Sequence, residues 1–268
     1  MPRGLKGGFP TYWTTFGQGP EPALLIHCSL AQSGVWGGLA QHLSGALTMT
    51  AFDLPGHGRS GEWDGVAEIQ GLCARMAADC AGEGPVDVIG HSFGATVALR
   101  VAHLFPARVR RMVLIEPVFF TAVLGGDARL RVLHAAETAA FEDAMEREEH
   151  EAAAKAFLGL WGDGTPWARI PEEQRARLAA QMPLIAAAGP ALYADVGGLL
   201  APGVLEALPG PSLLIEGSRS PEIIGAINTV LASRLPGAER SIIGGAGHMS
   251  PSTHPHAVST EILRFLRR

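Results

Sequence analysis

A short turn motif contains the residue of this sequence best suited to nucleophilic chemistry. Residues 90–94 read GHSFG and fit the pattern G-x-S-x-G, in which a serine occupies a sharp turn between a strand and a helix. An apolar run, residues 86–89, precedes the motif, and a helical pattern, residues 95–99, follows it. The flanking glycines let strand and helix approach closely, and the helix amino terminus adds N–H groups and positive potential that stabilise a developing anion. The spacing therefore predicts that Ser92 is a nucleophile.

The segments around this turn alternate between strand and helix patterns. Short apolar runs recur between Gly and Pro residues, and the middle runs are apolar throughout, which is typical of strands buried on both faces of a parallel sheet. We expect strands at residues 11–16, 23–28, 47–54, 86–91, 112–116, 212–216 and 240–243. We expect helices between them at residues 34–45, 66–81, 93–105, 221–235 and 255–266. This alternation predicts an α/β fold with a doubly wound, mostly parallel sheet.

One long segment, residues 119–206, has no strand pattern. It contains helical patterns instead, at residues 128–139, 141–160, 171–187 and 190–200. An insertion at the carboxyl edge of an α/β sheet usually lies over the ligand crevice. We therefore expect a helical cap at residues 119–206 and an α/β core formed by residues 1–118 and 207–268.

The composition excludes several classes of protein. Of the 268 residues, 47% are hydrophobic and 18% are charged, which is the balance of a folded chain and not of a disordered one. The net charge of −5 argues against a nucleic-acid partner, because phosphate contacts need clustered Lys and Arg. The cysteines, Cys28, Cys73 and Cys80, form no CxxC and no zinc-site spacing. We expect no disulfide, no metal and no other cofactor.

The sequence also has no pattern for membrane insertion. Basic residues near the start are not followed by a continuous apolar stretch, so no secretory signal is predicted. The most apolar long window, residues 183–204, is interrupted by Gly, Pro and Asp and would not span a bilayer. We expect a cytoplasmic protein that acts on a small-molecule substrate, without a membrane or nucleic-acid partner. A homodimer remains open.

Four motifs in chain order resemble those of one enzyme family. The first is LLIH at residues 24–27, followed by Trp36, and the second is DLPGHGRS at residues 53–60. The third is the GHSFG turn, and the fourth is GGAGHM at residues 244–249, followed by a helical pattern. Together they resemble the small, cofactor-free branch of the α/β hydrolases, which includes esterases, lactonases, C–C bond hydrolases and haloperoxidase-like enzymes. The resemblance implies that the catalytic residues follow the chain order nucleophile, acid, histidine.

This resemblance implies roles for the residues at the matching positions. Ser92 would attack an acyl carbonyl, and His248 would take its proton and later deliver it to the leaving group. The backbone N–H groups of Phe93 and Ser29 would form the oxyanion hole. The glycine that the family usually has directly before this second donor is a cysteine here, which leaves Leu30 as the alternative donor.

The acid of the expected triad is not at the family's usual position. Many relatives have an aspartate three residues after the glycine that ends the next-to-last strand, but here that position is Ser220, which carries no negative charge. Glu116, Glu222 and Glu216 are the candidates. We expect Glu116, because it ends an apolar strand at the carboxyl edge of the sheet and needs a partner there. Some relatives, including haloalkane dehalogenases, supply their acid from this strand end.

A serine nucleophile narrows the reaction. Haloalkane dehalogenases and epoxide hydrolases attack with a carboxylate, whereas a serine implies acyl transfer to water from an ester, lactone or thioester. We expect a small, mostly apolar substrate, with a pocket that includes Trp36, Phe120, Leu124, Trp161 and Met249. Hydrolytic C–C bond cleavage, acyl transfer to another acceptor and a non-catalytic binding role are the alternatives.

Overall fold

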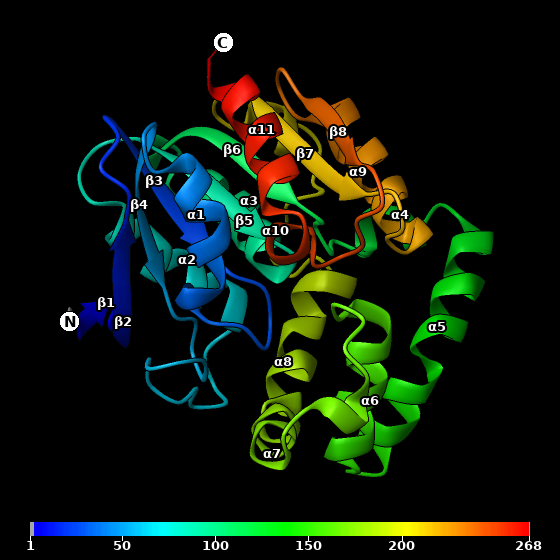
Figure 1. Ribbon diagram of the computed structural model, residues 1–268. Helices are drawn as coiled ribbons and strands as arrows, with labels where there is room; N and C mark the ends of the chain where they lie inside the picture. Colours follow the sequence, from blue (N-terminus) through cyan, green and yellow to red (C-terminus); the bar gives the residue numbers. More distant parts are fainter. Residues whose placement is uncertain (1–2, 268) are drawn as a thin grey trace.

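The computed structural model describes residues 3–267 and contains one eight-stranded sheet with helices on both faces (Figure 1). The strands are β1 (Arg3–Lys6), β2 (Phe9–Phe16), β3 (Glu21–Ile26), β4 (Leu47–Phe52), β5 (Val86–His91), β6 (Val109–Ile115), β7 (Ser212–Gly217) and β8 (Glu239–Ile243). Their spatial order is β1-β2-β4-β3-β5-β6-β7-β8. The strands from β3 to β8 run parallel to one another. At the edge, β1 pairs antiparallel with β2, and β2 pairs antiparallel with β4. The predicted doubly wound, mostly parallel α/β sheet is confirmed.

Two hydrophobic clusters hold the helices against the two faces of the sheet. Successive side chains of β3 alternate between them, with Leu24 and Ile26 in one cluster and Leu25 in the other. The first cluster lies under α2 (Ile69–Ala81), α3 (Phe93–Leu104) and α9 (Glu222–Arg234), and the second under α1 (Gly37–Leu43) and α11 (Pro255–Leu266). Because strand side chains point alternately to opposite faces, a strand buried on both sides must be apolar throughout.

The strand predictions were most accurate in the middle of the sheet. The predicted bounds of β5 match the structure, whereas β3 ends at Ile26, so His27 and Cys28 belong to the loop that follows. The edge strand β1 was not predicted, because its four residues are largely exposed and show no apolar alternation. The position of β1 at the edge of the sheet depends on its pairing with β2, and its own sequence does not indicate it.

The chain between β6 and β7 forms the helices α4 (Thr121–Leu124), α5 (Ala128–Glu146), α6 (His150–Trp161), α7 (Glu172–Ala180) and α8 (Met182–Tyr193). The first of these, α4, packs against α9 beside the sheet, whereas α5 to α8 form a group apart from it (Figure 1). Short 3₁₀ turns occur at Ser33–Trp36, Pro106–Arg108, Trp167–Arg169 and Leu205–Ala207, and α10 (Ser250–Thr253) precedes α11. Within residues 3–267, no helix has the length and apolar character needed to cross a membrane.

Two predictions for these helices were wrong. The expected single helix over residues 141–160 is broken after Glu146, where Glu148 has a φ of 58° and reverses the chain before α6. The expected helix start at Pro190 is also wrong, because Pro190 lies inside α8. The proline has no N–H to donate, so the helix continues through it to Tyr193 with one intrahelical hydrogen bond fewer.

A buried ion cluster ties β5 to β6 at the end of the sheet away from the GHSFG turn. Asp87 is fully buried, and its carboxylate accepts hydrogen bonds of 2.7–2.9 Å from the guanidinium groups of Arg110 and Arg111. Arg111 also donates to the carbonyl of Leu266 at the end of α11. The cluster therefore joins two central strands to the C-terminal helix.

We predict that Asp87→Ala lowers the free energy of unfolding by about 3 kcal/mol, because it leaves two guanidinium groups without their buried carboxylate. Urea unfolding followed by circular dichroism measures this change. Glu173→Ala, which removes an exposed ion pair with Arg177, serves as the matched control and should change stability by less than about 1 kcal/mol. Equal losses for the two variants would contradict the assignment.

Candidate active site

The turn that contains Ser92 is strained, and its neighbours fix it in place. Ser92 has a φ of 56° and a ψ of −120°, a conformation that residues other than glycine rarely adopt. A Cβ at Gly90 would lie 2.3 Å from the Gly94 carbonyl oxygen, and a Cβ at Gly94 would lie 2.2 Å from the Ile26 carbonyl oxygen. The Ser92 N–H donates to the carbonyl of Ile115 at the end of β6, 2.8 Å away. The two glycines are therefore required by the close approach of three backbone segments.

A hydrogen-bonded chain of three side chains begins at this turn. His248, from the loop between β8 and α10, has its Nε2 atom 2.9 Å from the Ser92 hydroxyl. Its Nδ1 atom lies 3.2 Å from Oε2 of Glu116, which directly follows β6. Ser92 and His248 are 7% and 4% exposed, and Glu116 is fully buried. The structure thus brings together the nucleophile, histidine and favoured acid of the sequence analysis.

His91 forms a hydrogen bond to the loop that contains His248. Its Nε2 atom lies 2.8 Å from the backbone carbonyl of His248, so this nitrogen is the protonated one and donates the bond. Burial is the main cause that lowers the pKa of His91 to about 3, and the neighbouring His248 lowers it further. His91 is therefore a neutral donor that holds the His248 backbone close to the Ser92 turn.

The other two candidate acids lie elsewhere. Glu222 is half exposed and pairs with Arg129, whose hydrogen bonds lower the pKa of its carboxyl. The carboxylate of Glu216 accepts hydrogen bonds from Arg240 and from the side-chain amide of Asn228. Of the three carboxylates, only that of Glu116 contacts His248.

The loop after β3 contains the expected second donor of the oxyanion hole. Leu30 has a φ of 62°, and its N–H donates to Nε2 of His57, 3.1 Å away. Because this N–H is already bonded to His57, Leu30 is not free to act as the second oxyanion donor, which leaves Ser29 of the two alternatives. Ser29 lines the cavity beside Ser92, as does Phe93 at the first position of α3. Ser29 and Phe93 therefore both border the cavity at Ser92, where a pair of oxyanion donors is expected.

Two buried histidines fix the shape of this loop. The N–H of Leu54 donates to Nε2 of His27, whose Nδ1–H donates to the carbonyl of Cys28. His57 accepts from Leu30 at Nε2, and its Nδ1–H donates to the carbonyl of Pro55. Burial lowers the pKa of His27 to about 3 and lowers that of His57 as well. Both rings are therefore neutral, with one nitrogen donating and the other accepting.

The DLPGHGRS motif shapes a neighbouring loop through its first residue. Both carboxylate oxygens of Asp53 accept backbone N–H groups, from Ser33 at 2.7 Å and from Arg59 at 2.8 Å. A Cβ at Gly58 would lie 2.1 Å from the Asp53 carboxylate, so only glycine fits there. Asp53 is thus a structural residue that connects this loop to the loop of Ser29.

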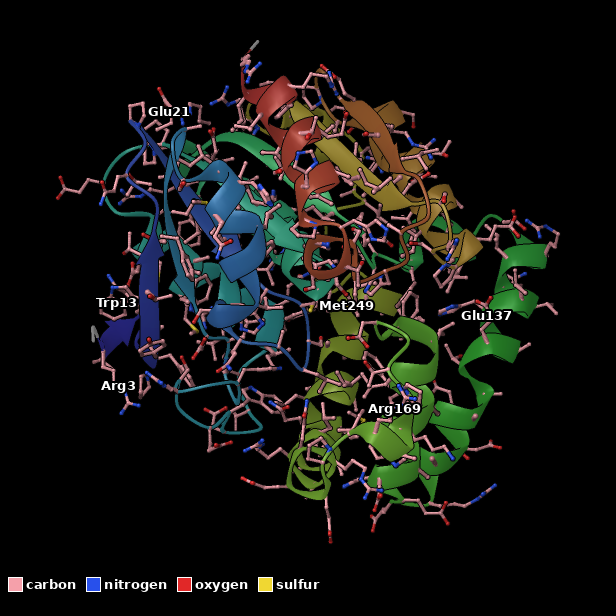
Figure 2. The ribbon with its side chains drawn as sticks, in the orientation of Figure 1. Arg3, Trp13, Glu21, Glu137, Arg169 and Met249 are labelled. Carbon is pink, nitrogen blue, oxygen red and sulfur yellow. The ribbon has the colours of Figure 1, made fainter. Side chains whose placement is uncertain are left out.

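The cavity beside Ser92 has two chambers. The first has a volume of about 420 Å³ and a mostly apolar wall built from α5, α6 and α8. The second has a volume of about 350 Å³ and includes His248 together with Arg169, Gln174 and Thr165. Ser29, Ser92, Phe157 and Trp161 line both chambers. Figure 2 labels Glu137 and Met249, which belong to the first and second walls respectively.

Three of the five predicted pocket residues line this cavity, and two do not. Phe120 and Trp161 line the first chamber, and Met249 lines the second. The prediction for Trp36 was wrong, because this side chain is 1% exposed within the cluster under α1 and α11. Leu124 is not among the residues that line either chamber; its side chain packs against the cluster that also contains Phe120 and Trp161. Helical spacing identifies an apolar face but does not say whether that face meets a cavity or the core.

The sequence analysis missed the polar residues of the second chamber. Arg169 and Gln174 come from the segment between α6 and α8, and Figure 2 labels Arg169 there. Isolated polar residues in a helical segment have no pattern that separates a cavity wall from a solvated surface. A short loop flanked by Pro166 and Pro171 was the one signal that could have drawn attention to Arg169.

Other reactive groups near the site are unsuited to its chemistry. Burial raises the pKa of the Cys28 thiol to about 12, so this cysteine is not a thiolate near neutral pH. Across residues 3–267, no three or more His, Cys, Asp or Glu side chains are grouped so that they could hold a metal ion.

Comparisons with known proteins place this geometry in context. Residues 23–261 match the family model described as the alpha/beta hydrolase family. The chain is 29% identical over 269 residues to a pimeloyl-[acyl-carrier protein] methyl ester esterase of Cronobacter sakazakii, covering 96% of this chain and 97% of that protein.

Other relatives are similar over a shorter stretch or in fold alone. The chain is 36% identical over 151 residues to the lipase LipV of Mycobacterium tuberculosis and spans about half of it, 54% of its length against 55% of this chain. A serine hydrolase involved in carbazole degradation, the CarC enzyme, has a similar structure, with a TM-score of 0.71 and 20% identity over 99% of this chain and 98% of that one.

We predict that stability falls as the pH drops from 6.5 towards 5, because the buried rings of His27, His57 and His91 cannot take up the protons that an unfolded chain binds near its ordinary pKa of 6.5. Their contribution is complete above pH 6.5 and declines as the pH falls towards their lowered pKa values. Each ring removes up to about 1.4 kcal/mol of unfolding free energy for each pH unit below 6.5. Urea unfolding at pH 7.5, 6.0 and 5.0 measures the slope.

His57→Gln is the matched variant for this measurement. The glutamine oxygen can accept the Leu30 N–H in place of Nε2, but the side chain does not titrate. The slope should therefore decrease by up to about 1.4 kcal/mol for each pH unit. A slope that is unchanged in this variant would exclude His57 from the effect.

Proposed function

Since the chain belongs to the alpha/beta hydrolase family, we propose that it is a serine hydrolase that cleaves a small, mostly apolar ester, lactone or thioester through an acyl-enzyme on Ser92. One observation carries this proposal. The Ser92 hydroxyl is hydrogen-bonded to His248, which is hydrogen-bonded to the buried carboxylate of Glu116. The relatives named as a methyl ester esterase and a lipase support ester hydrolysis as the reaction.

In the proposed first half-reaction, the Ser92 oxygen attacks the substrate carbonyl while His248 Nε2 removes the hydroxyl proton. Glu116 accepts the Nδ1–H of the resulting imidazolium and stabilises its charge. The N–H groups of Phe93 and Ser29 bind the oxyanion of the tetrahedral intermediate. When the intermediate collapses, the bond to the leaving group breaks and His248 returns the proton to the departing oxygen or sulfur.

In the second half-reaction, a water molecule replaces the leaving group. His248 removes a proton from this water, and the resulting oxygen nucleophile attacks the acyl carbon. The second tetrahedral intermediate collapses, the bond to Ser92 breaks, and the serine regains its proton from His248. The products are a carboxylic acid and the alcohol or thiol that left first, whereas a lactone, whose alcohol stays attached to the acyl group, gives a single hydroxy acid.

The two chambers suggest how the substrate lies. His248 must reach the leaving group, and it lines the second chamber, so we assign the leaving group to that side. The acyl group then occupies the first chamber, which includes Phe93 and has apolar walls such as Phe120 and Leu160. Burial of an alkyl chain there contributes about 0.8 kcal/mol for each CH₂ group.

The charge of the first chamber favours an uncharged acyl group. Glu137 and Glu142 on α5 belong to its wall. Within residues 3–267, neither carboxylate forms an ion pair with Lys, Arg or His. A negatively charged acyl tail would therefore meet uncompensated like charge, and a neutral alkyl tail would not.

The helices between β6 and β7 supply much of the wall of both chambers. We propose that residues 119–206 act as a cap that shapes the substrate site on a core of residues 1–118 and 207–268. A cytoplasmic enzyme that works without a cofactor, as a monomer or homodimer, is consistent with this proposal.

We predict that Ser92→Ala abolishes hydrolysis of p-nitrophenyl butyrate, with kcat at least about a thousandfold below that of the parent chain, because the nucleophile is lost. Spectrophotometric assays measure turnover, and labelling of Ser92 by a fluorophosphonate provides a second readout. Turnover that persists in Ser92→Ala would contradict the acyl-enzyme. Absence of both turnover and labelling in the parent chain would favour a non-catalytic binding role.

A comparison of two carboxyl groups tests the acid. Glu116→Gln should lower kcat by at least about a hundredfold, because the imidazolium loses its charge partner. Glu222→Gln, which changes an exposed carboxyl paired with Arg129, is the control and should keep kcat within about twofold. The opposite ranking of the two variants would show that Glu222 is the acid.

The acyl chamber predicts a change in chain-length preference. Gly189 lines it on α8, and a Cβ added there meets no heavy atom within 4 Å. Gly189→Phe should fill the chamber and lower kcat/KM for p-nitrophenyl octanoate by about a hundredfold relative to acetate. Gly159→Phe, an exposed change on α6 that does not line the chamber, should leave this ratio unchanged. The same ratio in both variants would place the acyl group elsewhere.

A further inference from the structure

The position where relatives usually have their triad acid is occupied by a residue that contacts the acid of this chain. Ser220 lies in the turn between β7 and α9, and its hydroxyl donates to Oε1 of Glu116, 2.7 Å away. We propose that Ser220 is a positioning residue that sets the orientation of the Glu116 carboxylate towards His248. This inference rests on the proposed function, since it concerns the acid of the same triad.

The hydrogen bonds of the carboxylate divide between its two oxygens. Oε1 accepts the N–H of Gly217 and the hydroxyl of Ser220, whereas Oε2 faces His248. Glu116 is fully buried, so a carboxylate oxygen that lost its donor would have to find another inside the protein or rotate. Two donors on Oε1 fix the plane of the carboxylate and leave Oε2 as the oxygen available to Nδ1.

The turn that contains Ser220 is itself fixed against the histidine loop. The N–H of Ser220 donates to the Gly217 carbonyl. The N–H of Arg219 donates to the carbonyl of Ala246, which lies two residues before His248. The hydroxyl of Ser218 in turn accepts the N–H of Gly245. Consequently the donor to the acid and the loop of the histidine belong to one hydrogen-bonded unit.

The backbone of Glu116 explains why the acid needs such support. Its φ is 53°, an unfavourable conformation for a residue with a side chain, and its N–H donates to the Ile215 carbonyl of β7. The side chain must therefore turn from the end of β6 across the end of β7 to reach His248. Ser220 meets it at that crossing.

With a carboxylate at position 116, position 220 needs a neutral hydrogen-bond donor such as the serine hydroxyl. A second carboxylate at 220 would lie beside Glu116, and two like charges in a buried site cannot both stay ionised without a large free-energy cost. Without the carboxylate at 116, however, an aspartate at 220 could place its own carboxylate in the space that Glu116 leaves, since the Ser220 hydroxyl lies 2.7 Å from Oε1. The geometry therefore makes the two acid positions alternatives to each other.

Ser220→Ala and Ser220→Thr test the positioning role. The alanine variant should lower kcat by about tenfold with KM within twofold of the parent value, because one donor to a buried charge is lost without a change in the cavity wall. The threonine variant retains the hydroxyl and should keep at least about half of the parent kcat. Ser233→Ala, which removes an exposed hydroxyl on α9 that donates to the Val230 carbonyl far from the triad, is the control.

Proton NMR gives a readout that does not require turnover. The low-field resonance of the His248 Nδ1 proton, identified by its loss in His248→Asn, reports the bond to Glu116. This resonance should move in Ser220→Ala and keep its position in Ser233→Ala and Ser220→Thr. An unchanged resonance in Ser220→Ala overturns the inference, whatever the turnover of that variant.

An exchange of the two positions completes the experiment. Glu116→Gly suits the positive φ and should lose at least about a hundredfold in kcat. Adding Ser220→Asp to that variant should recover about tenfold or more, whereas Ser220→Asp alone should lower the activity of the parent chain. Failure of the double variant to exceed Glu116→Gly overturns the inference that the two positions are alternatives.

These outcomes separate the inference from the proposed function. If the parent chain shows no Ser92-dependent hydrolysis, the proposed function fails, and the histidine resonance still decides whether Ser220 orients Glu116. If the parent chain hydrolyses esters but Ser220→Ala keeps the parent kcat and resonance, the inference alone fails.

Discussion

The buried carboxylate of Glu116 is the constraint on which the rest of the site depends. A charged group without exposure is stable only if each oxygen has a donor, and here the donors come from Gly217 at the end of β7, from Ser220 in the turn that follows and from His248. Parallel strands end at one edge of the sheet, so β6, β7 and the loop after β8 can meet there. The apolar strands and their two hydrophobic clusters keep this edge rigid.

Neutral histidines perform a second structural task, at the opposite side of Ser92. His27 and His57 each donate with one nitrogen and accept with the other, which joins the loop of Ser29 to the loop that Asp53 organises. Burial lowers the pKa of both rings although Asp53 nearby opposes the shift, so their accepting nitrogens stay unprotonated. Of the buried histidines around Ser92, His27, His57 and His91 therefore hold loops in place, and His248 contacts the serine.

The sequence was most informative where local and long-range requirements coincide. The apolar strands, the GHSFG turn and the position of Glu116 beside His248 could be inferred, because strand ends and glycine-flanked turns have few alternatives. The break after Glu146, the helical continuation through Pro190 and the burial of Trp36 could not, because they depend on packing between distant segments. The contact between Ser220 and Glu116 joins residues 104 positions apart, and no local pattern encodes it.

The two-chambered cavity has a consequence for the fate of the acyl-enzyme under the proposed mechanism. Once the first product departs, the second chamber is empty while the acyl group still fills the first, and both chambers meet at Ser92. Water and any alcohol from solution then compete for the same space beside His248. The wall that contains Arg169 and Gln174 consequently determines how the acyl-enzyme divides between hydrolysis and transesterification. The apolar wall of the first chamber determines which acyl groups the enzyme accepts.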